Sequence, residues 1–542
     1  MAFDARALLA VFLAPAIAAQ VPRQRPSLVV VVVVDQLRAD YLGHWGDQWR
    51  GGLARFWSHG TVFEHGRQDH ASTETAPGHS TILSGRHPSH TGIVLNARGV
   101  PDASSPVLGM IDTVGASPRR FRGTTLYDWM LARDPGARVL AVSRKDRAAI
   151  LTVGRARGDV YWYAGGQFTT SHYYADSLPA WVREVNRRGG VRRLAGTTWS
   201  LLRPAADYAE ADSEPFENAG IDFTFPHTLP DTSLIDTRVT AYPWMDSLTL
   251  ALALEGVRRL GLGQRSGPDL LVVGLSTTDA VGHAFGPDSR ELHDQLLRVD
   301  LWLGQFFDSL AHLVSPERTV AALTGDHGVS PLPEYSVLVR HKPAGRVWLG
   351  WIAQQLQTTL AARFQTDFGV NFDNGLLSAD VDALKARGIN VDSLAAALAS
   401  EANAFPGVAR VFTPAKLARA PVTDADADVW RRLLPPDYGW LFCAMPKPGY
   451  VWSGGSLGAE HGGADADDIA VPIAFWGGGI PAQHVARPAR TVDIGPTLAA
   501  LLGVRPTEKV DGEVLVEVEG ETASLHSLHL PLPPPEQHRR DK

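Results

Sequence analysis

Residues 28–35 read Leu-Val-Val-Val-Val-Val-Val-Asp, and this stretch decides which fold class the rest of the chain must satisfy. An unbroken apolar run rich in β-branched residues indicates a strand buried on both faces, as in the middle of a parallel sheet. The run is too short to cross a membrane, and it ends on Asp35. Ligands bind at the carboxyl edge of parallel sheets, so we expect Asp35 to be placed for function, although a helix N-cap would use the same residue type.

Similar apolar runs recur along the chain and alternate with amphipathic segments. They end in polar residues, which is typical of strands that share one carboxyl edge. The expected fold class is therefore α/β, with a mostly parallel central sheet flanked by helices. The further strands are expected at residues 137–142, 269–275, 319–323 and 469–475, and the helices at residues 53–59, 246–260, 290–313 and 492–502.

Two segments break this alternation and are expected to be insertions that cap one large domain, residues 25–515. Residues 154–240 are rich in aromatic residues, Gly and Pro and show poor periodicity, so we expect them to lie over the functional face and outside the sheet core. Residues 331–450 contain helical patterns at 351–364 and 391–402, which favour a small α/β unit.

The composition excludes several classes of protein. The chain has 542 residues, of which 44% are hydrophobic and 20% charged, values that are ordinary for a soluble globular protein. A net charge of -7 gives no reason to expect nucleic-acid binding. Cys443 is the only cysteine, so the chain can form neither an intrachain disulfide nor a thiolate metal cluster. Any metal site must use His, Asp and hydroxyl oxygen.

The two ends of the chain differ from the rest. Residues 1–19 combine a short apolar run with small residues at Ala16 and Ala18, which is the pattern of a secretory signal peptide; a buried helix is the alternative. A periplasmic or secreted location is therefore expected. No later stretch predicts a transmembrane segment. Residues 520–542 form a Pro-rich tail that is expected to be disordered.

Residues 72–80 read Ser-Thr-Glu-Thr-Ala-Pro-Gly-His-Ser and predict a sharp turn that opens into a helix. Thr75 would project its hydroxyl from the helix N-terminus, where free N–H groups and the helix dipole favour a phosphate. A hydroxyl is a poor nucleophile unless a base or a metal ion ionises it. The remaining sequence must therefore supply metal ligands.

Ligand-type side chains follow three of the expected strands. Asp279 and His283 are four residues apart, so one helical turn can direct both to one ion. Asp326 and His327 follow another strand, and His461 lies in a third cluster. Each pattern alone is more often a helix cap or a surface imidazole. Together with Asp35 they predict a paired metal site that would ionise Thr75 and stabilise a leaving oxygen.

These motifs resemble those of the alkaline phosphatase superfamily, and within it those of the type I phosphodiesterase/nucleotide pyrophosphatase group. The resemblance implies an alkaline-phosphatase-like catalytic domain with two Zn²⁺ ions and with Thr75 as the nucleophile. It gives no role to Glu460, and His79 is taken as structural. The stretches that carry it are 34–42, 75–81, 279–287, 324–328 and 461–462. The resemblance assigns one Zn²⁺ to Asp279, His283 and His461, and the other to Asp35, Asp326 and His327, with Thr75 against the second ion.

Residues 143–147 read Ser-Arg-Lys-Asp-Arg and resemble a stretch of the phosphate-irrepressible (PafA-like) alkaline phosphatases. In that branch the residues matching Lys145, Arg147 and Asn96 bind non-bridging phosphate oxygens. The physics agrees, because a phosphate monoester dianion keeps more charged oxygens for these cations than a diester does. A basic strand end that simply faces solvent is the alternative.

The sequence therefore predicts a zinc-dependent phosphate monoesterase that acts on small-molecule phosphate monoesters through a phosphothreonine intermediate, and we expect a monomer. A phosphodiesterase or nucleotide pyrophosphatase on the same core is the nearest rival, against which Lys145 and Arg147 argue. A non-catalytic metal- or phosphate-binding protein is the rival from another class. Glu74 stands directly before Thr75 and would repel phosphate if it pointed inward, so its role is left open.

Overall fold

The computed structural model describes residues 25–111, 113–188, 190–364 and 369–519. The predicted signal peptide, residues 1–19, and the predicted tail, residues 520–542, lie outside these ranges. Within the described part of the chain, no helix is both long and apolar enough to span a membrane.

The predicted strand at residues 28–34 is β1 (Leu28–Val34), the fully buried middle strand of a nine-stranded sheet. It pairs in parallel with β10 and β9, and β4 and β5 continue the parallel run. Antiparallel pairing occurs at β17 and β6. The expected α/β class with a mostly parallel sheet is confirmed. In spatial order the strands are β18 (Gln483–Val485), β2 (Thr61–Phe63), β17 (Ile473–Gly477), β10 (Thr319–Thr324), β1, β9 (Asp269–Leu275), β4 (Val139–Ser143), β5 (Asp159–Ala164) and β6 (Gln167–Thr169).

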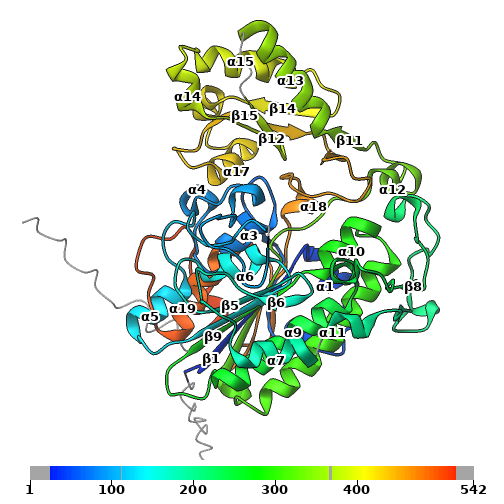
Figure 1. Ribbon diagram of the computed structural model, residues 1–542, viewed down its shortest axis with the longest axis vertical. Coiled ribbons are helices and arrows are strands. Elements are labelled where there is room, and N and C mark those ends of the chain that lie inside the picture. The colour runs from blue at the N-terminus through cyan, green and yellow to red at the C-terminus, as the bar shows by residue number, and fades with distance from the viewer. Residues whose placement is uncertain (1–24, 112, 189, 365–368, 520–542) are drawn as a thin grey trace, which may run out of the picture.

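Side chains of β1 enter two separate cores, because successive residues of a strand point to opposite faces. Val30 and Val32 join one core and Val29 and Val31 the other, so helices cover both faces of the sheet (Figure 1). The first face carries α1 (Ala39–His44), α2 (Gly52–His59), α7 (Ala180–Arg188), α9 (Trp244–Leu260), α10 (Thr277–Phe285) and α11 (Arg290–Ala311). The second carries α3 (Thr75–Ile82), α5 (Leu126–Arg133), α6 (Asp146–Val153) and α19 (Ile494–Leu502).

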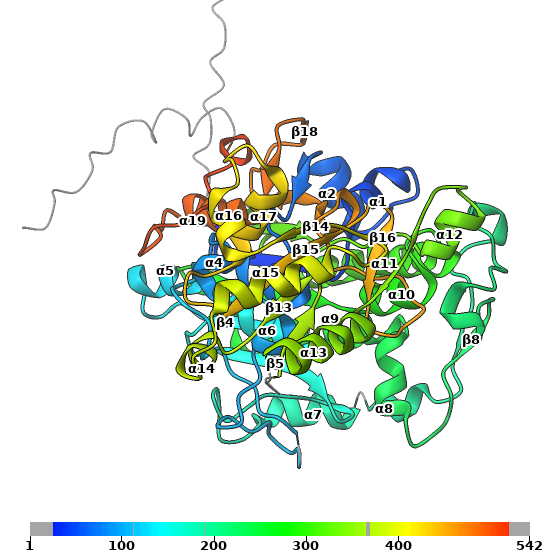
Figure 2. The same ribbon diagram turned by 90° about the horizontal axis from the view of Figure 1, so that it is seen from above.

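A second, smaller sheet lies beside the main body, with its own hydrophobic core. Figure 1 shows it above α3 and α4 (Pro88–Thr91), and Figure 2 views it from above. The expected helices at 351–364 and 391–402 are present in it. Its strands are β12 (Asn371–Asp373), β13 (Leu376–Ser378), β15 (Trp440–Pro446) and β14 (Val408–Phe412), and its helices are α13 (Leu349–Phe364), α14 (Val381–Ala386) and α15 (Val391–Ala402), with α16 (Pro414–Arg419) and α17 (Ala425–Leu433) nearby.

Short elements join these parts. Three two-stranded sheets are formed by β3 (Gly66–Arg67) with β19 (Ala489–Arg490), β7 (Thr198–Trp199) with β8 (His227–Thr228), and β11 (Gly345–Trp348) with β16 (Tyr450–Ser453). The remaining α-helices are α8 (Ile235–Arg238), α12 (Pro333–Leu338) and α18 (Ala466–Ile469).

The expectation that residues 154–240 stay outside the sheet core is wrong for β5 and β6, which extend the central sheet. Four residues of β5 are buried in succession, so the strand shows no polar–apolar alternation. Gly165 and Gly166 both have positive φ and join the two strands in a two-residue hairpin. The Gly-Gly pair between two aromatic-rich runs is the sequence feature that could have predicted this hairpin.

Several element boundaries also differ from the sequence prediction, and two of the differences change how an element is placed. The expected strand at 469–475 starts later, because α18 comes first, and β17 runs antiparallel to β10. The helix expected to begin at Asp246 begins at Trp244 instead. The Asp246 carboxylate does not cap its own helix but accepts a hydrogen bond from the backbone N–H of Thr277, at the start of α10.

Candidate active site

Thr75 is the first residue of α3, where residues 72–80 predict a turn into a helix. Pro77 fits the first helical turn because the N–H that proline lacks has no intrahelical acceptor there. Gly78 is required by packing, since a Cβ at this position would lie 2.1 Å from the Asp326 carbonyl oxygen. The helix therefore lies directly against the end of β10, and Thr75 is 1% exposed.

Three buried carboxylates lie at the carboxyl edge of the sheet. Asp35 follows β1, Asp326 follows β10, and Asp279 lies in the first turn of α10 after β9. Among the described residues, Asp35 Oδ1 has no hydrogen-bond partner, Asp35 Oδ2 contacts Lys145 Nζ, and Asp326 Oδ2 contacts His79 Nδ1. Carboxylates buried this close together repel one another and need cations between them, so these oxygens fit the ligands of a metal ion.

The Lys145 ammonium lies among these carboxylates. Its Nζ is 2.7 Å from Oδ2 of Asp35 and 2.7 Å from Oδ2 of Asp279, and it donates to Thr75 Oγ1 at 3.1 Å. Burial alone would raise the pKa of Asp279, but Lys145 and His283 outweigh it and hold that pKa well below its ordinary value. At Asp35 the balance is opposite, since burial and the neighbouring Asp279 raise its pKa.

Three histidines around this edge share one hydrogen-bonding pattern. Each ring places Nδ1 against a backbone carbonyl oxygen, which can only accept, so Nδ1 carries the proton. In the neutral ring this leaves the Nε2 lone pair for a ligand, as in many metal sites. The bonds run from His283 to Ala459 (2.6 Å), from His461 to Thr73 (2.7 Å) and from His327 to Gly328 (2.9 Å).

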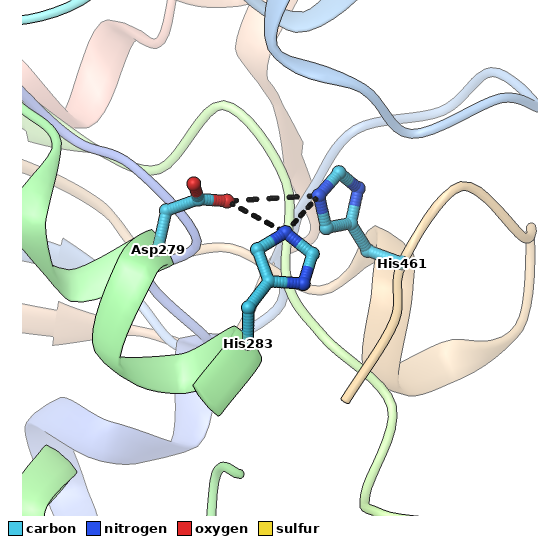
Figure 3. Close-up of side chains that lie close together, drawn as sticks. All are labelled: Asp279, His283 and His461. Carbon is cyan, nitrogen blue, oxygen red and sulfur yellow. Dashed lines mark hydrogen bonds and ion pairs between the residues drawn. The ribbon is translucent and has the colours of Figure 1, made fainter. Parts of the chain in front are cut away.

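Asp279, His283 and His461 form the first ligand group (Figure 3). His283 Nε2 lies 3.3 Å from Asp279 Oδ1 and 3.1 Å from His461 Nε2. Burial lowers the pKa of His461 to about 3, which keeps its ring neutral. At His283, burial is outweighed by Asp279 and the pKa rises to about 9, so a cation bound here would compete with that proton.

The second ligand group is Asp35, Asp279 and His327. His327 Nε2 lies 3.5 Å from Asp35 Oδ1 and 3.6 Å from Asp326 Oδ2. Asp326, which the resemblance places in this set, borders the group, and its Oδ2 lies 3.1 Å from His79 Nδ1. Imidazole and carboxylate donors at this spacing fit Zn²⁺ or a similar divalent ion.

Of the candidate phosphate-binding residues, Lys145 contacts Thr75, and Arg147 and Asn96 lie on elements that pack against α3. Lys145 stands between β4 and α6, and Arg147 lies in the first turn of α6, which packs against α3. Asn96 begins a short 3₁₀ turn, and its side-chain oxygen accepts a hydrogen bond from the backbone N–H of Ala76 at 2.8 Å. All three residues are thus anchored to elements that meet at α3.

Glu74 does point inward and is 2% exposed. Its carboxylate is taken up by protein contacts, because Oε2 accepts from the Asn96 N–H at 2.6 Å and Oε1 accepts from Asn374 Nδ2 at 2.6 Å. Burial, together with Asp373, raises the pKa of Glu74 to about 7.

Sequence reasoning missed residues that support the site. Gln36 adopts a φ of +67°, its backbone N–H donates to Asp326 Oδ1 at 3.1 Å, and its Nε2 donates to Asp279 Oδ1 at 3.3 Å. Asp246 accepts from the Thr277 N–H and so fixes the start of the helix that carries Asp279. No local pattern signals either role, because each partner lies far along the chain.

Comparisons with known proteins identify the family of this chain. Residues 29–367 match the family model described as type I phosphodiesterase / nucleotide pyrophosphatase. Alkaline phosphatase PhoK of Sphingomonas sp is 32% identical over 537 residues and 92% of each chain. Alkaline phosphatase PafA of Elizabethkingia meningoseptica is 29% identical over 92% of this chain and 95% of its own length. A crystal structure of PafA matches with a TM-score of 0.83 and 27% identity, over 92% of this chain and 99% of that one.

The family model covers more than half of the chain, and the relatives match nearly all of it. The resemblance read from the motifs is confirmed, as is the alkaline-phosphatase-like core. The chain belongs to the type I phosphodiesterase/nucleotide pyrophosphatase family, within the alkaline phosphatase superfamily and on its PafA-like side.

Proposed function

We propose that this chain is a zinc-dependent alkaline phosphatase that hydrolyses small-molecule phosphate monoesters. The observation that carries the proposal is the position of Lys145, whose Nζ contacts the Thr75 hydroxyl and two buried carboxylates. A cation beside the nucleophile favours a dianionic monoester over a diester, which has fewer charged oxygens. The names of the relatives, alkaline phosphatases PhoK and PafA, support the same activity.

The residues present fit two zinc ions. We assign Asp279, His283 and His461 to one ion, and Asp35, Asp326 and His327 to the other, with the Thr75 oxygen beside the second. The two-ion assignment is supported by the two ligand groups, which share Asp279, and by the position of Asp326 beside the second group, where its Oδ2 lies 3.6 Å from His327 Nε2. When bound, the ions would lower the pKa of the Thr75 hydroxyl and stabilise the charge of the leaving oxygen.

The side chains of the protein carry out the two steps of the reaction. The Thr75 oxygen attacks phosphorus in line, the bond from phosphorus to the alcohol oxygen breaks, and a phosphothreonine forms. Water then breaks the bond between phosphorus and the Thr75 oxygen, which releases inorganic phosphate and restores the hydroxyl. Throughout, Lys145, Arg147 and Asn96 hold the non-bridging phosphoryl oxygens.

The test compares an aryl phosphate with a bis-aryl phosphate diester at fixed Zn²⁺. We expect kcat/KM to favour the monoester by at least about 100-fold, since several cationic and amide donors meet its charged oxygens. A preference for the diester would make the chain a phosphodiesterase, and bound zinc without turnover of either ester would make it a binding protein.

We also propose that the protein is exported to the periplasm or the medium. The apolar run and small residues at 1–19 support this location. N-terminal sequencing of protein from the periplasm or the culture medium tests it, and a mature chain that still contains residues 1–19 would contradict it.

A further inference from the structure

Glu74 immediately precedes Thr75, and the proposed reaction assigns it no role. Its side chain is buried, although a carboxylate loses its water there and needs strong partners. Oε2 accepts from the backbone of Asn96, and Oε1 accepts from the side chain of Asn374 at 2.6 Å and, at 3.3 Å, from the hydroxyl of Ser72. A buried polar group that is held on both sides restrains the groups that hold it.

The first contact fixes Asn96. The Asn96 N–H donates to Glu74 Oε2 at 2.6 Å. The Asn96 side-chain oxygen accepts from the Ala76 N–H, one residue beyond Thr75. Because the backbone and the amide oxygen are both held, the side-chain NH₂ is the donor left for a ligand, and it has no partner among the described residues.

The second contact comes from the other sheet. Asn374 and Gly375 form the turn of the β12–β13 hairpin, with φ of +42° and +81°, a left-handed pair that suits Asn and Gly in a two-residue loop. The Asn374 side chain also lies against Gly462, where a Cβ would come within 2.5 Å of Asn374 Cγ. Since Gly462 follows His461, the hairpin reaches the edge of the ligand groups.

We propose that Glu74 is a positioning residue that orients Asn96 toward a non-bridging phosphoryl oxygen, and that Asn374 holds Glu74 in this orientation. The proposal rests on the proposed function, because it matters only if Asn96 meets a phosphoryl group. The β12–β13 hairpin, far along the chain from α3, is thereby part of the machinery that selects the ester.

A double-mutant cycle tests this role. We expect Glu74→Ala and Asn96→Ala each to lower kcat/KM for an aryl phosphate by about 10- to 100-fold, the range for a misplaced binding group. The double variant should fall no more than about twofold below Asn96→Ala, because no side-chain NH₂ is left to orient. Losses that multiply in the double variant would overturn the proposal.

Glu74→Gln separates positioning from simple packing. Its amide oxygen can still accept from the Asn96 N–H, and Asn374 can turn its own amide oxygen toward the new NH₂. We therefore expect activity within about threefold of the wild type, since both contacts survive. A loss as large as that of Glu74→Ala would show that the charge, and not the position of Asn96, is what matters, and would overturn the proposal.

Asn374→Ala keeps the test decisive if Glu74→Ala fails to fold. It should lower kcat/KM in the wild type and have no effect in the Asn96→Ala background. An Asn374→Ala variant as active as the wild type would overturn the role of Asn374. Glu508→Ala is the matched control, because Glu508 also accepts a hydrogen bond from a backbone N–H, that of Thr124, away from the ligand groups.

The outcomes for the proposed function and for the positioning role can be told apart. A wild type without monoesterase activity would refute the proposed function itself. An active wild type with losses that multiply in the double variant would refute the positioning role alone.

Discussion

The Lys145 Nζ lies 3.1 Å from Thr75 Oγ1, although the two residues are 70 positions apart. Thr75 begins α3 and Lys145 directly precedes α6, and these two helices pack against each other on one face of the sheet. The nucleophile candidate and its nearest cation are therefore fixed by the same packing contact. This arrangement makes the contribution of each residue separately measurable.

We predict that Thr75→Ala abolishes phosphatase turnover while metal binding survives. The hydroxyl oxygen is the proposed attacking atom, and the expected loss in kcat is at least about 10³-fold, as for other nucleophile removals. Turnover of an aryl phosphate and zinc content per chain are measured on the same sample.

Ser80→Ala is the control for Thr75→Ala, because it removes a buried hydroxyl from the same helix that bonds to the Pro77 carbonyl oxygen. It should keep most of the activity. Near-wild-type turnover by Thr75→Ala would show that another residue is the nucleophile.

We predict that Lys145→Met lowers kcat/KM for an aryl phosphate monoester by about 100-fold or more, as when a charge-stabilising donor is removed. The loss for a bis-aryl diester should be much smaller, because a diester offers fewer charged oxygens. The ratio of the two kcat/KM values is the measurement. Equal losses on both esters would mean that Lys145 only balances Asp35 and Asp279.

The fold was predictable where burial produces continuous apolar runs. The strands expected at 28–34 and 269–275 match β1 and β9 residue for residue, since both are buried on both faces. Because ligands bind at the carboxyl edge of a parallel sheet, the order of these strands also predicts where the Asp and His candidates meet. The aromatic strand β5 was missed because its sequence shows neither polar–apolar alternation nor a long aliphatic run.

The supporting contacts of the site could not be predicted, because they depend on tertiary packing. Asn374 meets Glu74 across 300 positions, and Asp246 reaches the start of α10 from the preceding helix. Gln36 adopts a left-handed backbone that no local residue preference requires. Local patterns report which residue types carry the chemistry, whereas the contacts that orient them appear only once the chain is folded.

We predict that a chelator removes both phosphatase activity and part of the thermal stability, and that Zn²⁺ restores both. Without a bound cation, the buried carboxylates of Asp35, Asp279 and Asp326 repel one another, and a ligand that binds the folded state stabilises it by mass action. Activity and Tm are measured before chelation, after it and after re-addition of Zn²⁺, with Mg²⁺ as the comparison. Full activity in protein that holds no detectable metal would contradict the zinc assignment.

His87 provides a pH-dependent contact remote from the ligand groups. Its Nε2 lies 3.0 Å from Asp69 Oδ1, and its Nδ1 lies 3.4 Å from Asp511 Oδ2, so the ring joins two distant segments. Burial lowers the pKa of His87, but the two carboxylates outweigh it and raise that pKa to about 9. Burial would raise the pKa of Asp69, but His87, Arg432 and Arg490 outweigh it and lower that pKa to about 2.

We predict that this contact stabilises the fold at pH 6 and is lost as the pH rises through about 9. A pKa raised on folding means that the folded state holds the proton more tightly, so the stabilisation is complete below the unfolded value of 6.5 and disappears above 9. The shift corresponds to roughly 3 kcal/mol at most. In Tm profiles from pH 6 to 10, His87→Gln should flatten the alkaline decline, whereas His312→Gln, which changes an exposed residue, should not. Parallel profiles for the wild type and His87→Gln would show that His87 does not hold its proton in the folded protein.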